Sequence, residues 1–582
     1  MKLRVHSLIG LGALLLAACS TTPGIDPLDS TNREAAAVSA VERGDFSTAQ
    51  DLYTALVERA QGGERARFQI ALARVEIELG RPEFAVAVLD AIGLPLPVEL
   101  DPELSAVRAS ALFLLGQTVE AVQLLVDREI WLESGADILD NQAKIWDGLN
   151  DPRSLAAASF RSGDATIDGW LALAPLTRLT DDGTRFLDAL VGWREEFINH
   201  PAAGGILAAR LAELRGDGAR PARIALLLPL SSELRTSAQT VLQGFFAGHF
   251  DAEAANDVSI QVYDTALRGS VESFQTAQLD GADFVVGPLT TEEVDLVQSQ
   301  SGFIPTLALN LAAREVLAAT NFFQFALSSD DEVDAIAARA IADGHRTAAI
   351  LYASSDRGYS QRDRFRTAFE SRGGQVINSV VYVPGSNNLS APIQELLNIS
   401  ASEARYERLR ANLGLPLEFE ARRRGDIDMI FLQVEPGGGA ADARLLVPLL
   451  ANNDASPENI PTFATSNVYD PQRQTRNADL DGLIFPDLPL LVNPAGQAAA
   501  MRLNEFSPSS AGQSPRLFAF GFDAYRLVNA LFSAREARWP LSGSTGELYL
   551  GENGRIRRVL PFAIFRDGEP QALMPSAVFL SP

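Results

Sequence analysis

The chain has 582 residues and a formal net charge of −25 at pH 7, and 47% of its residues are hydrophobic. This length suffices for about three or four domain-sized units, each with its own buried core. The negative charge argues against nucleic acid as a partner and against broad adhesion to anionic lipid, because the long-range field repels both. Cys19 is the only cysteine, which excludes disulfides within the chain, cysteine zinc clusters and a cysteine nucleophile beyond that position.

The first residues have the layout of a bacterial lipoprotein signal peptide. Two basic residues precede an apolar run at residues 8–18, which stops at Cys19. The run is roughly half as long as a helix needs to cross a bilayer, so a permanent transmembrane anchor is not expected. Residues 16–19, Leu-Ala-Ala-Cys, resemble the lipobox, in which the nucleophilic thiol receives diacylglycerol. We predict that the signal peptide, residues 1–18, is removed and that Cys19 carries the lipid.

The segment after the cysteine indicates where the protein is anchored. Residues 19–33 are expected to form a flexible tether, because Pro23, Gly24 and Pro27 interrupt a polar stretch. Ser20 stands where an aspartate would resemble the inner-membrane retention signal of enteric bacteria. We therefore expect a lipid-anchored protein of the outer membrane that faces the periplasm.

Residues 34–214 are predicted to form an all-α domain of helical repeats. Gly44, Gly80 and Gly116 follow one another at intervals of 36 residues. Small residues at matching points let two helices approach closely, the glycine turns the chain between them, and apolar residues fill the seam. The pattern resembles the tetratricopeptide repeat, whose period is about 34 residues. Four further columns repeat at the same interval: Ala37, Ala73 and Ala109; Val41, Ile77 and Phe113; Ala49, Ala85 and Ala121; Leu52, Val88 and Leu124.

Two functions are open for this helical solenoid. Solenoids usually hold peptides or partner proteins on a concave face and carry no chemistry. The alternative is a spacer that lifts the rest of the chain off the membrane. A weaker fourth repeat is expected at residues 146–161, where Asn-Asp-Pro at residues 150–152 turns the chain.

The second half of the chain predicts an α/β domain. Residues 215–222 are polar and glycine-rich, as expected of a linker. In residues 223–582, apolar runs typical of buried strands alternate with amphipathic helices, which implies parallel sheets with right-handed crossovers. The pattern restarts after residue 327, so we expect two lobes with a cleft between them. The predicted strands are residues 224–228, 258–263, 284–286, 306–309, 348–352, 376–383 and 429–434, and the predicted helices include residues 236–250, 332–343 and 363–372.

Two sets of segments resemble known families. Residues 224–231 (IALLLPLS), 285–289 (VVGPL) and 305–310 (PTLALN) look like the lobes of the type I periplasmic-binding-protein fold. The second resemblance is to the LpoA (LppC) lipoproteins, and it covers nearly the whole mature chain, including the lipobox and the order of the domains. The segments that carry it are residues 422–428 (RRRGDID), 519–524 (AFGFDA), 543–546 (GSTG) and 554–565.

The second resemblance implies a non-enzymatic regulator. Members of that family pair a tetratricopeptide-like domain with the two-lobed fold, lie in the outer membrane and activate a class A penicillin-binding protein. We expect the same partner here, with peptidoglycan as a further contact, and no cofactor.

No residue pattern predicts catalysis or metal binding. His200, His249 and His345 are far apart and fit no zinc-protease spacing, and the pentapeptide Gly-x-Ser-x-Gly does not occur. The carboxylate pair Asp330-Asp331 is typical of a solvated surface or a helix start. A glycan-acting enzyme would need a paired acid and base in a recognisable setting, and none is found. The glycines at residues 437–439 lack the Lys-Ser or Lys-Thr of a phosphate-binding loop.

The rival function is a lipid-anchored receptor for a small solute held in the cleft between the lobes. Amino-acid importers usually place hydroxyl residues on the loop after the fourth strand, where this chain has Leu-Ala-Leu-Asn at residues 307–310. Only Asn310 is polar there. Ser231 and Ser232, on the first loop, are the other candidate cleft residues, and the ligand itself cannot be read from the sequence.

Arg422, Arg423 and Arg424 are the candidate contact for an acidic partner surface or for glycan carboxylates, which arginine binds through two parallel hydrogen bonds. The alternative is that they pair within the chain. The expected internal partners are Glu403, Glu407, Glu418 and Glu420. The sequence leaves the two interpretations equal.

Overall fold

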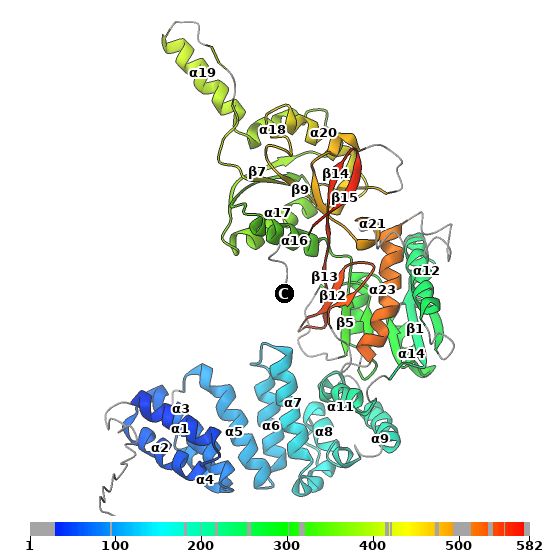
Figure 1. The fold of residues 1–582 in the computed structure, drawn as a ribbon. Coiled ribbons are helices and arrows are strands. Elements are labelled where there is room, and N and C mark those ends of the chain that lie inside the picture. The colour runs from blue at the N-terminus through cyan, green and yellow to red at the C-terminus, as the bar shows by residue number, and fades with distance from the viewer. Residues whose placement is uncertain are drawn as a thin grey trace, which may run out of the picture. The chain divides into compact units, whose positions relative to one another are not determined.

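The structure is a computed structural model that describes residues 30–93, 96–179, 183–197, 200–215, 219–252, 258–300, 302–313, 321–413, 418–419, 422–471, 477–492, 514–532, 539–551 and 553–574. Cys19, the predicted signal peptide and most of the predicted tether lie outside these residues. Contacts divide the chain into two compact units (Figure 1). The first comprises residues up to Leu132 together with Ala143–Leu179, and the second comprises Glu133–Gln142 together with the residues from Thr180 onward.

The first unit is the predicted helical repeat. Gly44, Gly80 and Gly116 follow its helices with φ angles of 72°, 71° and 77°, a left-handed conformation that glycine adopts without strain. The predicted seam between helices is confirmed, because the alanines of both repeated columns are fully buried. The helices are α1 (Ser30–Glu42), α2 (Phe46–Arg59), α3 (Gly62–Glu78), α4 (Pro82–Asp90), α5 (Asp101–Leu114), α6 (Thr118–Glu129), α7 (Gly135–Leu149), which spans both units, and α8 (Ala165–Ala172), with 3-10 helices at Val98–Leu100, Pro152–Ser159 and Leu176–Arg178.

Three helices that we predicted as the end of the repeat domain belong by their contacts to the second unit. They are α9 (Gly183–Glu196), α10 (Pro201–Gly204) and α11 (Ile206–Arg215). The Arg194 guanidinium on α9 donates to Gln278 Oε1 at 2.7 Å, and the Trp193 ring centroid lies 6.2 Å from that of Phe303. Residues far along the chain therefore hold this helix.

The first lobe of the second unit contains an eight-stranded sheet in the order β11-β12-β13-β5-β4-β3-β1-β2. Its strands from β2 through β13 are parallel, and β11 and β12 continue the sheet in antiparallel pairing. The strands are β1 (Arg223–Leu228), β2 (Ser259–Asp264), β3 (Phe284–Val286), β4 (Thr306–Ala308), β5 (Phe322–Phe325), β11 (Leu541–Ser542), β12 (Glu547–Leu550) and β13 (Arg555–Val559), and the helices are α12 (Arg235–Asp251), α13 (Thr265–Arg268), α14 (Ser270–Leu279), α15 (Thr291–Gln298) and α23 (Pro515–Phe532).

The second lobe contains a seven-stranded sheet in the order β15-β14-β10-β9-β8-β6-β7. Strands β7 through β10 are parallel, while β14 and β15 are antiparallel to their neighbours. The strands are β6 (Thr347–Ala353), β7 (Gln375–Tyr382), β8 (Met429–Leu432), β9 (Thr462–Ala464), β10 (Ile484–Pro486), β14 (Phe562–Arg566) and β15 (Glu569–Leu573), and the helices are α16 (Ser329–Ala342), α17 (Asp356–Glu370), α18 (Ser390–Leu396), α19 (Ile399–Leu413), α20 (Gly439–Ala451) and α21 (Pro489–Val492).

All seven predicted strands and the helices predicted at residues 236–250 and 332–343 are confirmed to within a few residues, whereas the helix predicted at residues 363–372 begins seven residues earlier, at Asp356. The antiparallel strands near the C-terminus were not predicted. The chain passes between the lobes three times: from β5 to α16, from β10 to α23 and from β13 to β14. The junction of the lobes is therefore formed by residues that are far apart in sequence.

Helices α12 and α23 cover one face of the first sheet and cross each other closely. Gly244 on α12 and Gly521 on α23 lie where the two backbones meet, and a Cβ built on either would come within 2.1 Å of a carbonyl oxygen of the facing helix. A Cβ built on Gly248, one turn after Gly244, would lie 2.8 Å from the carbonyl oxygen of Phe522. Only glycine permits this separation of the two helix axes.

Candidate functional site

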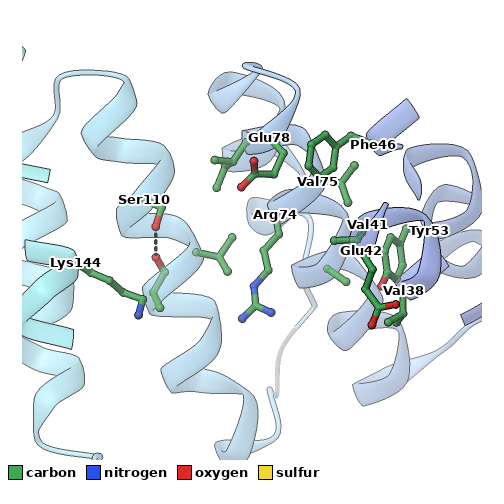
Figure 2. A pocket seen from close by; sticks show the side chains of 14 residues that line it. Val38, Val41, Glu42, Phe46, Tyr53, Arg74, Val75, Glu78, Ser110 and Lys144 are labelled. Atoms are coloured by element: carbon green, nitrogen blue, oxygen red, sulfur yellow. Dashed lines mark hydrogen bonds between the residues drawn. The ribbon is translucent and has the colours of Figure 1, made fainter. Parts of the chain in front are cut away.

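The first unit has a groove with a volume of about 530 Å³. Figure 2 shows side chains from the successive helices α1, α3, α5 and α7 lining it, with Phe46 and Tyr53 added from α2. Its lining residues are Val38, Val41, Glu42, Phe46, Tyr53, Ala71, Arg74, Val75, Ile77, Glu78, Ala106, Val107, Ser110 and Lys144.

The repeat places these side chains in the groove. Val38, Arg74 and Ser110 occupy one column of the 36-residue repeat, and Glu42 and Glu78 occupy another. Each repeat consists of two helices, and α1, α3 and α5 are the first helices of their repeats. A column therefore places one side chain from each of these helices at an equivalent position on the same face of the unit. The residue type changes within the first of these columns and stays acidic in the second, so the groove combines a repeated geometry with a varied chemistry.

The groove combines an apolar floor with charged edges. Arg74 forms an ion pair with Glu103 at 2.9 Å, and 56% of its side chain remains exposed. Ser110 donates its hydroxyl to the carbonyl of Ala106 at 3.0 Å. Tyr53 is 6% exposed, and this burial raises the pKa of its hydroxyl. The arrangement is suited to binding and presents no paired acid, base and nucleophile.

A second notable region is a set of buried charges where the two lobes meet. Arg516, at the start of α23, donates to Asp487 after β10, with 3.0 Å between Nε and Oδ1, and also to the carbonyls of Ser466 and Tyr469 at 3.2 and 3.1 Å. Asp487 is fully buried. Glu332 on α16 accepts from the amide and the hydroxyl of Ser466 at 2.8 and 2.9 Å, and burial raises the pKa of its carboxyl. Four segments of the chain are thus joined through one network.

A second ion pair lies at the passage from β13 to β14. The Arg558 guanidinium is 3.5 Å from the carboxylate of Asp331, and it also donates to the carbonyl of Ser328 at 3.0 Å. Asp330 and Asp331 both stand in the first turn of α16, which agrees with the helix-start interpretation, although the Asp331 side chain is only 10% exposed. Burial raises the pKa of Asp331. These charges are matched within the fold, so we assign them to holding the lobes together.

The predicted cleft residues lie on loops at the carboxyl ends of β1 and β4, as expected. Ser231 donates its hydroxyl to the carboxylate of Asp264, and Ser232 donates its hydroxyl to a carbonyl of the same loop at 2.9 Å. Asn310 donates to the Leu289 carbonyl at 3.0 Å. Ser232 thus bonds within its own loop, whereas Ser231 and Asn310 tie their loops to the ends of the neighbouring strands β2 and β3. A role for them in holding a ligand stays a prediction.

The three arginines at residues 422–424 have partners that we did not name from the sequence. Arg423 donates from Nε to the carbonyl of Asp454 at 2.6 Å and lies 3.4 Å from its carboxylate. Arg424 forms two hydrogen bonds with Asp426, at 2.6 and 2.8 Å, which raise the pKa of its guanidinium. Arg422 beside them is exposed. Arg423 and Arg424 thus contact neighbouring aspartates, and binding of a partner through the three arginines stays a prediction.

Two of the sequence segments that carry the family resemblance meet in space. Asp523, in the segment AFGFDA, accepts hydrogen bonds from the amides of Ser544 and Thr545 at 2.8 and 2.7 Å and from the Thr545 hydroxyl at 2.6 Å. Burial raises the pKa of Asp523, and these three donors oppose that shift. The fully buried Asp523 therefore fixes the GSTG turn before β12 against α23, which gives both segments a structural role.

The residues described by the structure contain no group of three histidine, cysteine, aspartate or glutamate side chains placed to hold a metal ion. Across the same residues, every helix is too short or too polar to span a membrane.

The structure thus combines a helical-repeat unit that has an open groove with a two-lobed α/β unit whose charged junction is internally paired. The chain belongs to the family described as "LppC putative lipoprotein", whose model matches residues 29–568. It is similar to the penicillin-binding protein activator LpoA of Vibrio cholerae serotype O1, with 27% identity over 606 residues that cover 95% of this chain and 96% of that one. It is also similar to the protein of that name from Photobacterium profundum, with 26% identity over 513 residues covering 86% and 82%.

Among solved structures, full-length LpoA from Haemophilus influenzae is similar over 94% of this chain and 95% of its own, with 21% identity and a TM-score of 0.48. The separate C-domain of that protein, described as a regulator of PBP1A, matches 60% of this chain with a TM-score of 0.47.

Proposed function

We propose that this chain is an outer-membrane lipoprotein, anchored through Cys19, that binds and activates a class A penicillin-binding protein and so regulates peptidoglycan synthesis. The observation that carries the proposal is the family match across residues 29–568, together with relatives named penicillin-binding protein activator that align with 95% of this chain. We propose the activity of those relatives for this chain because the alignments span the same domains in the same order.

Two surface features of the chain support a regulator that acts by binding another macromolecule. We propose the groove of the first unit as a contact for a macromolecule, and the arginines at residues 422–424 as a contact for an acidic partner surface or for peptidoglycan. A receptor for a small solute has less support, because the side chains of Ser231, Ser232 and Asn310 already bond to groups of the chain itself.

Adding the soluble chain, from residue 20 onward, to a purified class A penicillin-binding protein should raise the rate of glycan polymerisation or of crosslinking. The expected change is severalfold, because an activator shifts the synthase toward a more active state by differential binding. Both rates are measured on lipid-linked disaccharide substrate, with a synthase lacking the class A architecture as the control. Unchanged rates in both assays, with no complex in sedimentation analysis, would refute the proposal.

Replacing Cys19 with serine should abolish lipid attachment. Serine has no thiolate to act as the nucleophile near neutral pH, so diacylglycerol is not transferred. Metabolic labelling with a clickable fatty acid should mark the native chain and leave the variant unmarked. Cell fractionation should find the native chain, but not the variant, in the outer-membrane fraction. A Ser20→Ala variant is the matched control and should be labelled normally. Labelling of the Cys19→Ser chain would contradict both the attachment site and the anchor.

A further inference from the structure

Helix α19 (Ile399–Leu413) is held by the second lobe at its base. Figure 1 shows it extending away from the sheet of that lobe, and of its 15 residues only Ile399, the first, is buried. A helix of this length is marginal in water by itself, because most helices in proteins are stabilised by the packing of one face. A surface that covered one face of α19 would therefore stabilise it.

An apolar stripe runs along α19. Tyr406, Leu409 and Leu413 follow one another at spacings of three and four residues, which places them on one face of the helix. Leu409 and Leu413 are 54% and 55% exposed. The ring of Phe419 stacks on that of Tyr406 with 4.2 Å between the centroids, and Phe419 is itself 40% exposed. The stripe is apolar surface in contact with water, and its burial would be favourable.

The charges that border the stripe complement a second copy of the same helix. Glu403 and Arg410 lie on one edge, about two turns apart, and both are exposed. Arg410 is 3.7 Å from Glu407 on its own helix, and 59% of its side chain remains exposed. A two-fold axis between Glu403 and Arg410 would set each of them opposite the other residue of the second copy. On the other edge, Arg405 would face the uncharged Asn412.

We propose that α19 is a self-association helix, which pairs with α19 of a second copy of this chain in antiparallel orientation. The stripe of each helix would pack against that of the other, as in an antiparallel coiled coil. Ser402 would lie opposite Leu413 of the second copy, and Tyr406 would lie opposite its Leu409. The symmetry forms each of these two contacts twice.

The same charges disfavour a parallel pair and an acidic partner. In a parallel pair, Arg405 would face Arg410 of the second copy on both sides of the stripe, and like charges so placed are destabilising. A wholly acidic segment would meet Glu403. The whole chain has a net charge of −25, but α19 carries three arginines and two glutamates, so its pairing brings no two negative surfaces together.

The pair is expected to be weak in solution. Two helices of this length bury less than the ~1,200 Å² at which stable complexes begin, and Ser402 fills its layer poorly. Copies anchored in one membrane meet at a much higher effective concentration. This last step rests on the proposed lipid at Cys19, whereas the pairing itself is tested on the soluble chain.

The soluble chain from residue 20 onward contains no cysteine, so introduced cysteines report the contact cleanly. Glu403→Cys and Arg410→Cys chains, one of them with a mass tag, are mixed and treated with a short bismaleimide. The mixture should give a crosslinked heterodimer in about tenfold higher yield than either variant gives alone. Two like positions are about 10 Å further apart along the axis of an antiparallel pair, because each residue adds about 1.5 Å.

Charge exchange locates the contact. Arg410→Glu should weaken self-association about tenfold, because Glu403 then faces a carboxylate twice, and the double variant with Glu403→Arg should restore it. Arg408→Glu is the matched control, since Arg408 is also exposed and lies about 200° around the helix from Arg410. Ser402→Leu should strengthen the pair at least about tenfold by filling two layers, which brings the dimer within reach of sedimentation velocity.

Three results would overturn the proposal. The first is a Ser402→Leu chain that sediments as a monomer at its highest soluble concentration and gives no heterodimer above background in the cysteine pairs. The second is crosslinking of Arg405→Cys with Arg410→Cys, which only a parallel pair brings together. The third is equal weakening by Arg410→Glu and Arg408→Glu, which would place the contact elsewhere on the chain. Synthase stimulation is measured separately, so its failure leaves these outcomes unchanged.

Discussion

Replacing Arg516 with alanine should lower the free energy of unfolding of the second unit by about 3–5 kcal/mol, the usual cost of leaving one member of a buried ion pair without its partner. Asp487 is fully buried and receives two hydrogen bonds from the Arg516 guanidinium. The same guanidinium also donates to the carbonyls of Ser466 and Tyr469, so the substitution leaves three acceptors without this donor. Urea unfolding followed by circular dichroism measures the loss.

The matched control removes both charges. The double variant Arg516→Met with Asp487→Leu should lose much less stability than Arg516→Ala, because apolar side chains of similar volume need no partner. Hydrogen exchange at residues 466–469 should rise in the single variant, since this segment loses its link to α23. A loss below about 1 kcal/mol for the single variant, in the range of exposed ion pairs, would show that the pair does not hold the junction.

Gly521→Leu should prevent α12 and α23 from packing and leave little folded protein, and even Gly521→Ala should cost about 3 kcal/mol or more. The first added carbon would lie 2.1 Å from the carbonyl oxygen of Val241, which belongs to a helix backbone and cannot move aside as a side chain could. Separating the helices would expose the core of the first lobe, to which Phe245 and Phe520 contribute. Soluble yield and melting temperature measure the effect.

Gly192→Ala is the control for this prediction. Gly192 lies within α9 and is exposed, and no atom outside its own helix comes within 4 Å of a Cβ built there. Alanine should therefore be neutral or stabilise the chain by up to about 1 kcal/mol, as expected for an unhindered helix position. If the alanine variants at Gly192 and Gly521 melted at the same temperature, the close crossing of α12 and α23 would be wrong.

Much of the fold could be predicted because its signals are local or periodic. The interval between Gly44, Gly80 and Gly116 indicated the helical repeat, and continuous apolar runs such as residues 224–228 indicated buried parallel strands. The strands after residue 540 were missed. They are short, and β13 has arginine at three of its five positions, so neither length nor hydrophobicity separates β13 from a loop.

The candidate sites were harder to predict, for two different reasons. The groove could have been predicted from the repeat, because Val38, Arg74 and Ser110 each follow one of the buried alanines that define a repeated column. Their types differ, so the column does not stand out as a repeat. Arg516 and Asp487 gave no local signal, since their pairing depends on where the chain passes between the lobes. Arg423 likewise pairs with Asp454, which lies 31 residues further along the chain, whereas the partner of Arg424, Asp426, is two residues away and was overlooked.

The three passages between the lobes also set an order for folding. The helices of the first unit are complete by residue 179, so this unit can form as soon as the N-terminal third of the chain is available. Neither sheet of the second unit can be completed so early. The first needs β11 to β13 and the second needs β14 and β15, all of which lie between residues 541 and 573. Until those residues arrive, β5 and β10 each lack a neighbouring strand, and such open sheet edges are sites at which other chains can add. The last tenth of the sequence therefore closes both lobes together, and a chain truncated there would lose both.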